Sequence, residues 1–232
     1  MPPAAPRSVL RIDGRYTGPP TSANGGVSCG LLIAFVDAPA VEVTLRRPPP
    51  LDVDLRVAGG DLYDGEQLVA SARPGAVELE PHPPVTVAQA LAAEASYAGL
   101  TAHPFPGCFV CGTDRAAPDG LGLRPGPVAP GTVATTWTPM TDDAFLVWAA
   151  LDCPGGWAED VPGRPLVLGR MTLELHALPA VGAPHVVIGW VIGREGRKTF
   201  SGTALYDAGG TLLALAQQTW FAVDVATLTG QA

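Results

Sequence analysis

Ser28 stands in the string Gly26-Val27-Ser28-Cys29-Gly30, which fits the G-x-S-x-G pattern of a hydrolase nucleophile elbow. Such a serine sits on a tight turn between a strand and a helix, and it needs an acid and a histidine further along the chain. Here the preceding residues, "GPPTSAN", include two prolines, and the four histidines lie in a proline-rich linker or in expected strands. Because the short pattern lacks its structural context, we predict that Ser28 packs in the first turn of a helix.

The glycines of the same stretch offer a different chemistry. A helix that begins at Gly25 exposes the unpaired backbone N–H groups of its first turn, and the helix dipole adds positive charge there. Asn24, Gly25 and Gly26 leave these donors open to an approaching carbonyl oxygen. The sequence therefore predicts an oxyanion hole at this point, with these three residues as candidate catalytic residues.

Two of the four cysteines form a C-x-x-C pair, in "FPGCFVCGTD". A structural zinc site normally takes four ligands, from two such pairs or from one pair and two spaced histidines. The missing half can come only from scattered residues such as His103 or Cys153. We therefore expect Cys108 and Cys111 to be free, partly buried thiols, with no metal site.

An internal repeat indicates the architecture that must position these residues. "LYDGEQLVASA" and "LYDAGGTLLALA" both read as a β-hairpin whose second strand is buried. One apolar helix and one strand stand upstream of each hairpin: residues 27–38 and 41–48 in the first half, 142–158 and 168–179 in the second. We therefore predict a tandem repeat of one α+β unit.

The repeat divides the chain into three parts. Residues 1–75 and 120–232 form the two like units. The proline-rich residues 76–119 connect them and hold a short helix with a Thr86 and Gln89 capping box. The helix at 142–158 is apolar nearly all round, which predicts that a sheet surrounds it. The predicted fold class is α+β, with two units that each wrap a curved antiparallel sheet around one long central helix.

Three segments carry a resemblance to a known family. "CFVCGTDRAAPDGLGLRPG" looks like the lead-in of many single-hotdog thioesterases, and "GREGRKTFSGTALYDAGGTLLALAQQTW" looks like their closing strands. "NGG" before a helix, followed by "VTLRRPPPLDVDL", is similar to the N-terminal half of double-hotdog acyl-CoA thioesterases. Together these segments extend from the first half of the chain to its last strands, so the chain as a whole resembles a tandem (double) hotdog thioesterase.

The resemblance implies a catalytic acid about two turns along one hotdog helix, opposite glycines at the start of the other. The first half has Ile33 at the acid position, whereas the second half has Asp152. One composite site per chain follows, in which Asn24, Gly25 and Gly26 face Asp152. In the alternative interpretation, Asp152 is satisfied by the backbone of the "CPGG" turn near the helix C-terminus, a place that the helix dipole disfavours for an acid.

The same resemblance implies the substrate contacts. The acyl chain would lie between the two helices, near Trp148, Phe145 and Leu32. Arg197 and Lys198, in the cluster "REGRK", are candidates for binding the phosphates of coenzyme A, although such a stretch is more often a solvated turn. Gln218 matches the position of a catalytic glutamine in double-hotdog enzymes, but the usual Asp and Thr or Ser companions are not recognisable.

Composition and charge restrict the partners. The chain is 47% hydrophobic and 16% charged, which is typical of a globular protein. Its net charge of −8 and its single lysine argue against nucleic-acid binding. There is no apolar run of roughly 20 residues and no secretory N-terminus, so we expect a cytoplasmic protein that does not bind membranes. The sequence is compatible with a homo-oligomer and does not indicate the oligomeric state.

The sequence thus predicts hydrolysis of an acyl thioester, either an acyl-CoA or a carrier-bound acyl group, without a cofactor. Gly25 and Gly26 would polarise the carbonyl, and Asp152 would activate water or attack directly. The alternative is a non-catalytic protein that binds acyl-CoA or another small apolar ligand on a degenerate hotdog scaffold, because each half lacks one part of the site. A hydratase of this fold is less favoured, because neither helix offers an Asp and His pair.

Overall fold

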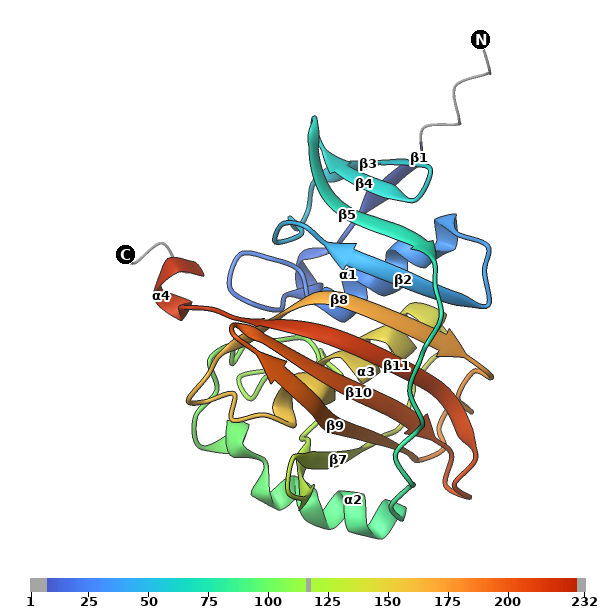
Figure 1. Cartoon of the computed structure of the whole chain (residues 1–232), viewed down its shortest axis with the longest axis vertical. Helices are drawn as coiled ribbons and strands as arrows, with labels where there is room; N and C mark the ends of the chain where they lie inside the picture. The colour runs from blue at the N-terminus through green and yellow to red at the C-terminus, as the bar shows by residue number, and fades with distance from the viewer. Residues whose placement is uncertain (1–7, 116–117, 229–232) are drawn as a thin grey trace.

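The computed structural model describes residues 8–115 and 118–228, so the first seven residues of the predicted N-terminal unit and the last four of the C-terminal one lie outside the description. The described strands form one antiparallel sheet in the order β1-β3-β4-β5-β2-β8-β11-β10-β9-β7-β6 (Figure 1). The N-terminal half supplies β1 (Ser8–Arg11), β2 (Ala40–Leu45), β3 (Asp54–Ala58), β4 (Asp61–Asp64) and β5 (Gln67–Pro74). The C-terminal half supplies β6 (Gly126–Ala129), β7 (Thr132–Trp137), β8 (Leu166–Leu175), β9 (His185–Glu195), β10 (Lys198–Tyr206) and β11 (Leu212–Ala222).

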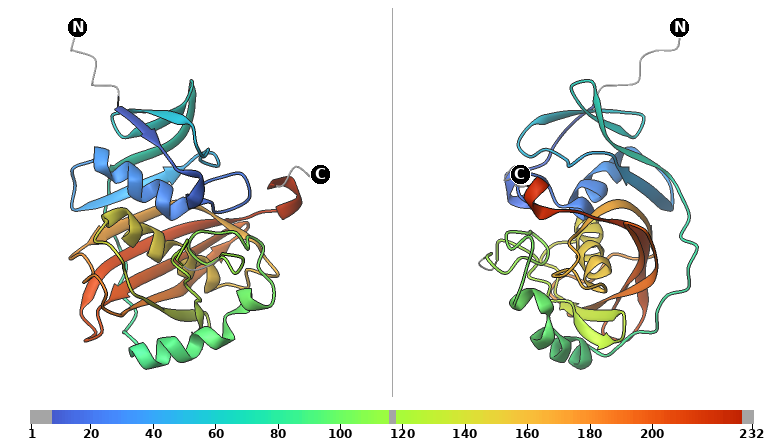
Figure 2. Two further views of the ribbon diagram at one scale, coloured as in Figure 1. Left: turned by 180° about the vertical axis from the view of Figure 1, so that it is seen from behind. Right: turned by 60° about the vertical axis from the view of Figure 1, so that its left-hand side comes forward.

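The two halves share the sheet through β2 and β8, which pair with Val43 opposite Met171. Both predicted hairpins are confirmed, as β4 with β5 and as β10 with β11. The sheet curves around the central helices of the two halves (Figure 2). The predicted α+β tandem hotdog architecture is therefore present. The division at residues 75 and 119 stays a prediction; the flanking strands end at Pro74 and begin at Gly126.

The described α-helices are α1 (Gly25–Leu32), α2 (Val87–Ala93), α3 (Ala144–Trp157) and α4 (Val225–Leu228). α2 begins with the predicted capping box of Thr86 and Gln89. The predicted helix at 27–38 is shorter, because a 3-10 turn follows at Ile33–Phe35 and Val36 is already extended. Pro39 disfavours helical geometry in the residue before it, which is consistent with this early end. No helix within the described ranges is long and apolar enough to cross a membrane.

The helices α1 and α3 run antiparallel in direct contact. A Cβ added at Gly26 would lie 2.5 Å from the Cβ of Asp152, and one added at Gly30 would lie 2.7 Å from the Cα of Phe145. Later positions on α1 thus meet earlier positions on α3. Only residues without a side chain permit this approach, so the two glycines of the G-x-S-x-G string determine how closely the helices pack.

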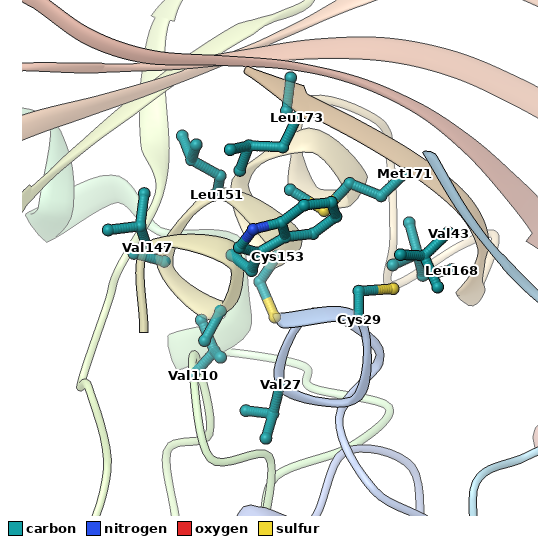
Figure 3. Close-up of a cluster of buried hydrophobic side chains, with 14 of the residues drawn as sticks. Val27, Cys29, Val43, Val110, Val147, Leu151, Cys153, Leu168, Met171 and Leu173 are labelled. Carbon is teal, nitrogen blue, oxygen red and sulfur yellow. The ribbon is translucent and has the colours of Figure 1, made fainter. Parts of the chain in front are cut away.

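Two clusters of apolar side chains lie on the two faces of the sheet. The main core fills the space between the helices and the inner face (Figure 3), with side chains from α1, α3, β2 and β8 that include Val27, Cys29, Val43, Val147, Leu151, Leu168, Met171 and Leu173. A second cluster joins Val186, Ile188 and Leu215 of the outer face to Val77, Val85 and Val87 of the connector. The connector therefore covers the outer face of the C-terminal half, as Figure 2 also shows.

Candidate active site

Asp152 of α3 meets the N-terminus of α1. Its carboxylate is 2% exposed, and Oδ2 accepts hydrogen bonds from Asn24 Nδ2 at 2.8 Å and from the Gly26 N–H at 2.9 Å. Among the described residues, Oδ1 has no hydrogen-bond partner. The structure thus brings together the acid of one half and the helix N-terminus of the other. Those partners belong to Asn24 and α1, and the "CPGG" residues that were expected to form a turn lie inside α3.

The orientation of Asn24 is set by its position as the N-cap of α1. Its Oδ1 accepts a hydrogen bond from the Val27 N–H at 2.9 Å, so its amide nitrogen is left to donate to Asp152. The Gly26 N–H, predicted to bind a substrate carbonyl, is already bonded to Asp152. The Gly25 N–H has no partner within the described ranges, so it remains as a donor.

Burial dominates the electrostatics of Asp152. The pKa of its carboxyl is raised to about 7. Desolvation is the main cause and the neighbouring Cys108 adds to it, whereas the hydrogen bonds from Gly26 and Asn24 lower the pKa and offset part of the rise. The folded chain thus holds an acid whose pKa lies far above that of an exposed aspartate. Carboxyl groups perturbed in this way occur often in functional clefts.

A cavity of about 430 Å³ opens beside these groups. Asn24, Gly25 and Asp152 form part of its wall. Apolar side chains from the C-terminal half and from the connector form another part: Phe105, Trp157, Val161, Leu166, Leu168, Trp220, Phe221 and Val223. An apolar group with a polar reacting end fits such a cavity.

Three exposed arginines also line the cavity, Arg46 and Arg47 just after β2 and Arg197 in the turn between β9 and β10. Within the described part of the chain none of them has a carboxylate at ion-pair distance. Lys198 is exposed but does not line the cavity. Sequence reasoning missed Arg46 and Arg47; the available signal was a pair of arginines before three prolines in an acidic chain.

The other predicted substrate residues lie elsewhere. Trp148 and Leu32 are 1% and 0% exposed and belong to the main core, outside the cavity wall. Phe145 lines a separate hollow and packs edge-on against Tyr16, with ring centroids 5.7 Å apart. The cavity therefore lies at the C-terminal end of α3 and not along the contact between the two helices.

Gln218 and Ser28 have structural contacts outside the cavity wall. Gln218 is buried on β11; its Nε2 donates to Leu151 O at 2.6 Å, and its Oε1 accepts from Ser201 Oγ at 3.0 Å. It thus fixes the helix segment that carries Asp152. Ser28 is 1% exposed and its Oγ donates to Asn24 O at 2.8 Å, which confirms that it packs in the first turn of α1.

Three cysteines complete the cavity wall. Cys108, Cys111 and Cys153 are buried, and their Sγ atoms lie within 4.8 Å of one another. Sequence spacing shows only the C-x-x-C pair, and the fold adds Cys153, which directly follows Asp152 on α3. These side chains are the metal-binding candidates of the site.

Neither a protein-family model nor a curated protein sequence matches the chain. Solved structures do. A conserved protein of unknown function with a hot dog fold from Alicyclobacillus acidocaldarius matches with a TM-score of 0.62 and 13% identity, over 95% of this chain and 97% of that one. The tesB protein of Mycobacterium avium subs paratuberculosis matches with a TM-score of 0.59 and 11% identity, over 94% and 93%.

A protein named as a thioesterase II in Thermobifida fusca matches with a TM-score of 0.63 and 16% identity, over 94% of this chain and 92% of that one. At these identities the likeness concerns the fold. Because it extends over nearly the whole of each chain, the fold is the double hotdog.

Proposed function

We propose that this protein hydrolyses acyl thioesters at the composite site between its two halves. The observation that carries the proposal is Asp152, a buried carboxylate on the cavity wall. Its Oδ2 is held by Asn24 and Gly26, and its Oδ1 has no hydrogen-bond partner in the part of the chain that the structure describes. Oδ1 is buried, and among the described residues it has no hydrogen bond that would compete with a reacting group. The name of one structural neighbour, a thioesterase II, supports this reaction class.

In the proposed mechanism the Gly25 N–H donates to the thioester carbonyl as negative charge develops on its oxygen. Asp152 Oδ1 either takes a proton from the attacking water, or adds to the carbonyl carbon to form an anhydride that water then hydrolyses. In both routes the carbon–sulfur bond breaks, and the thiolate leaves and takes up a proton from water or from the Asp152 carboxyl. Asn24 and Gly26 hold the carboxylate in place. The role of Gly26 therefore differs from the sequence prediction, in which it binds the substrate carbonyl.

The cavity supports an acyl-CoA as substrate. The apolar wall suits the acyl group, and Arg46, Arg47 and Arg197 offer unpaired positive charge where the phosphates of coenzyme A would lie. The chain as a whole has a net charge of −8, so an overall excess of basic residues does not explain the three arginines on one cavity wall.

The test is turnover of acyl-CoAs of graded chain length, measured as released coenzyme A by chromatography. Asp152→Asn keeps the shape of the side chain and an oxygen that can accept from Gly26, but it removes the base or nucleophile. We expect kcat to fall by at least about 100-fold, since general acid–base groups contribute factors of this size.

Asp207→Asn is the matched control, because Asp207 accepts backbone hydrogen bonds in an exposed turn and does not line the cavity. It should leave kcat unchanged. Turnover by Asp152→Asn within a few-fold of the natural chain would refute the proposal. So would tight binding of acyl-CoA by the natural chain without any turnover, which would identify a ligand-binding protein instead.

A further inference from the structure

Three buried thiols meet at the cavity wall beside the proposed reaction site. Cys108 and Cys111 come from the connector, and Cys153 comes from α3. The Sγ atoms of Cys108 and Cys153 are 3.7 Å apart, and all three Sγ atoms lie within 4.8 Å of one another. Across residues 8–115 and 118–228, this is the one group of three potential metal ligands gathered so closely. The cluster has no part in the proposed hydrolysis.

The spacing fits a metal ion bound by sulfur. With Zn–S bonds of about 2.3 Å in a tetrahedron, two sulfur ligands lie about 3.8 Å apart. The separation of 3.7 Å between Cys108 and Cys153 matches this edge. Thiolates are ligands that zinc prefers.

Each of the three sulfur atoms also faces an N–H donor. Trp157 Nε1 donates to Cys111 Sγ at 3.3 Å, and Asn24 Nδ2 lies 3.8 Å from Cys108 Sγ and 3.9 Å from Cys153 Sγ. Donors of this kind stabilise the negative charge of metal-bound thiolates and tune the metal.

The fourth ligand position is open to the cavity. His103 lies nearby, but its Nε2 bonds to Cys111 O at 3.1 Å and its Nδ1 accepts from the Phe105 N–H at 3.0 Å. Both ring nitrogens thus form hydrogen bonds with the backbone of the loop at residues 105–111, called here the cysteine loop, and neither is free to bind a metal. Because all three cysteines line the cavity, a ligand from the cavity can complete the coordination. Three protein ligands with one open position characterise catalytic zinc sites rather than closed structural ones.

We propose that Cys108, Cys111 and Cys153 together bind one Zn²⁺ ion whose fourth position faces the cavity. The sequence favoured free thiols because the C-x-x-C pair lacked partners, and the fold supplies a third thiol. The ion ties the cysteine loop to the helix that carries Asp152. On binding, each thiol releases its proton to solvent and the sulfur donates an electron pair to the metal.

The test is metal content of the full-length chain, which needs no turnover and so stands apart from the proposed hydrolysis. Purified protein is stripped with a chelator under reducing conditions, mixed with Zn²⁺ and freed of excess metal by gel filtration. We expect one zinc per chain by mass spectrometry of the metal. Co²⁺ in place of Zn²⁺ should give a sulfur-to-cobalt charge-transfer band.

Cys153→Ser should lose the bound zinc and the cobalt band. Cys29→Ser is the matched control, because Cys29 is equally buried but projects from α1 toward Val43 and Leu168, outside the cluster (Figure 3). It should keep both. Trp157→Phe retains an aromatic ring but removes the N–H donor to Cys111, and it should weaken zinc binding about tenfold or more.

If Cys153→Ser does not fold, the metal-free natural chain provides a second test. Zinc that binds the folded state should raise its thermal unfolding temperature. A stripped chain that takes up no zinc, or that binds Co²⁺ without the charge-transfer band, would overturn the proposal. Equal loss of zinc in Cys29→Ser and Cys153→Ser would do so too.

Discussion

At the scale of single residues, Asn24 links the stability of α1 to the candidate site. Its Oδ1 caps the helix through Val27, and its Nδ2 holds Asp152 Oδ2. An amide is the one small side chain that accepts at one end and donates at the other. Aspartate or serine would also cap the helix but cannot supply the same donor to the carboxylate. The helix cap and the hydrogen bond to Asp152 together explain why this position is an asparagine.

Asn24→Ala separates these two contacts when it is compared with Thr86→Ala, which removes the N-cap of α2. Loss of an N-cap costs about 1 kcal/mol, so both variants should lower the free energy of unfolding, measured in denaturant, by at least that amount. Only Asn24→Ala should also lower acyl-CoA turnover, by about tenfold or more, because Asp152 loses a partner. Equal turnover in the two variants would contradict a role for Asn24 at the site.

At the scale of elements, glycines allow the helices and the sheet to approach closely. Gly26 and Gly30 bring α1 against α3, and a Cβ added at Gly155 would lie 1.7 Å from Gln218 Oε1. The end of α3 is thus packed between α1 on one side and β11 on the other. This packing places Asp152 within hydrogen-bond distance of the Gly26 N–H. The contact between elements, and not either helix alone, makes the site.

Gly30→Ala tests this packing. The added Cβ would lie 2.7 Å from the Cα and O of Phe145, and backbone atoms cannot rotate away as a side chain can. We expect the free energy of unfolding to fall by about 2 kcal/mol, within the range seen for overpacked cores. Turnover should fall with it, as the helices separate.

Gly193→Ala serves as the comparison, because a Cβ added there meets nothing within 4 Å. It should change the free energy of unfolding by less than about 0.5 kcal/mol. If the Gly30→Ala chain were as stable as the Gly193→Ala chain, the contact between α1 and α3 would have room for a methyl group, which contradicts the close packing seen in the structure.

At the scale of the whole molecule, the cavity exists because the halves share one sheet. β2 and β8 pair at the centre, which brings Arg46 and Arg47 from the N-terminal half to the same cavity as Arg197 from the C-terminal half. The acid and the helix N-terminus are divided between the halves in the same way. Neither half alone contains the site.

If the three arginines bind the phosphates of coenzyme A as proposed, they should let the protein distinguish acyl-CoA from shorter thioesters. Arg46→Ala with Arg47→Ala should raise KM for an acyl-CoA about tenfold or more at low ionic strength and leave kcat near its original value. Salt should reduce the difference, because exposed charges are screened. With an acyl-pantetheine, which lacks the nucleotide phosphates, KM should not change.

Lys198→Ala is the control, since Lys198 is exposed but lies outside the cavity wall. It should leave KM unchanged for both substrates. A KM for acyl-pantetheine that rises as much as that for acyl-CoA would show that the arginines shape the cavity and do not bind phosphates.

The sequence by itself determined the parts of this protein that depend on local patterns. The hairpins, the capped α2, the apolar α3 and the glycines at the start of α1 follow from residue spacing, because backbone geometry and burial act over a few residues. Asp152 was identified through the resemblance to hotdog thioesterases, which implies an acid at that point of the helix, and Ser28 was excluded by its neighbours. These predictions needed no knowledge of which elements touch.

Only the tertiary structure decided which side chains distant in the sequence come into contact. Trp148 and Leu32 fit an apolar tunnel by type, yet the helices pack so closely that both lie in the core. Cys153 joins Cys108 and Cys111, and Arg46 and Arg47 join Arg197, across separations that carry no periodic signal. Such contacts depend on the register between β2 and β8 and on the distance between α1 and α3, which are set by the packing of the whole chain.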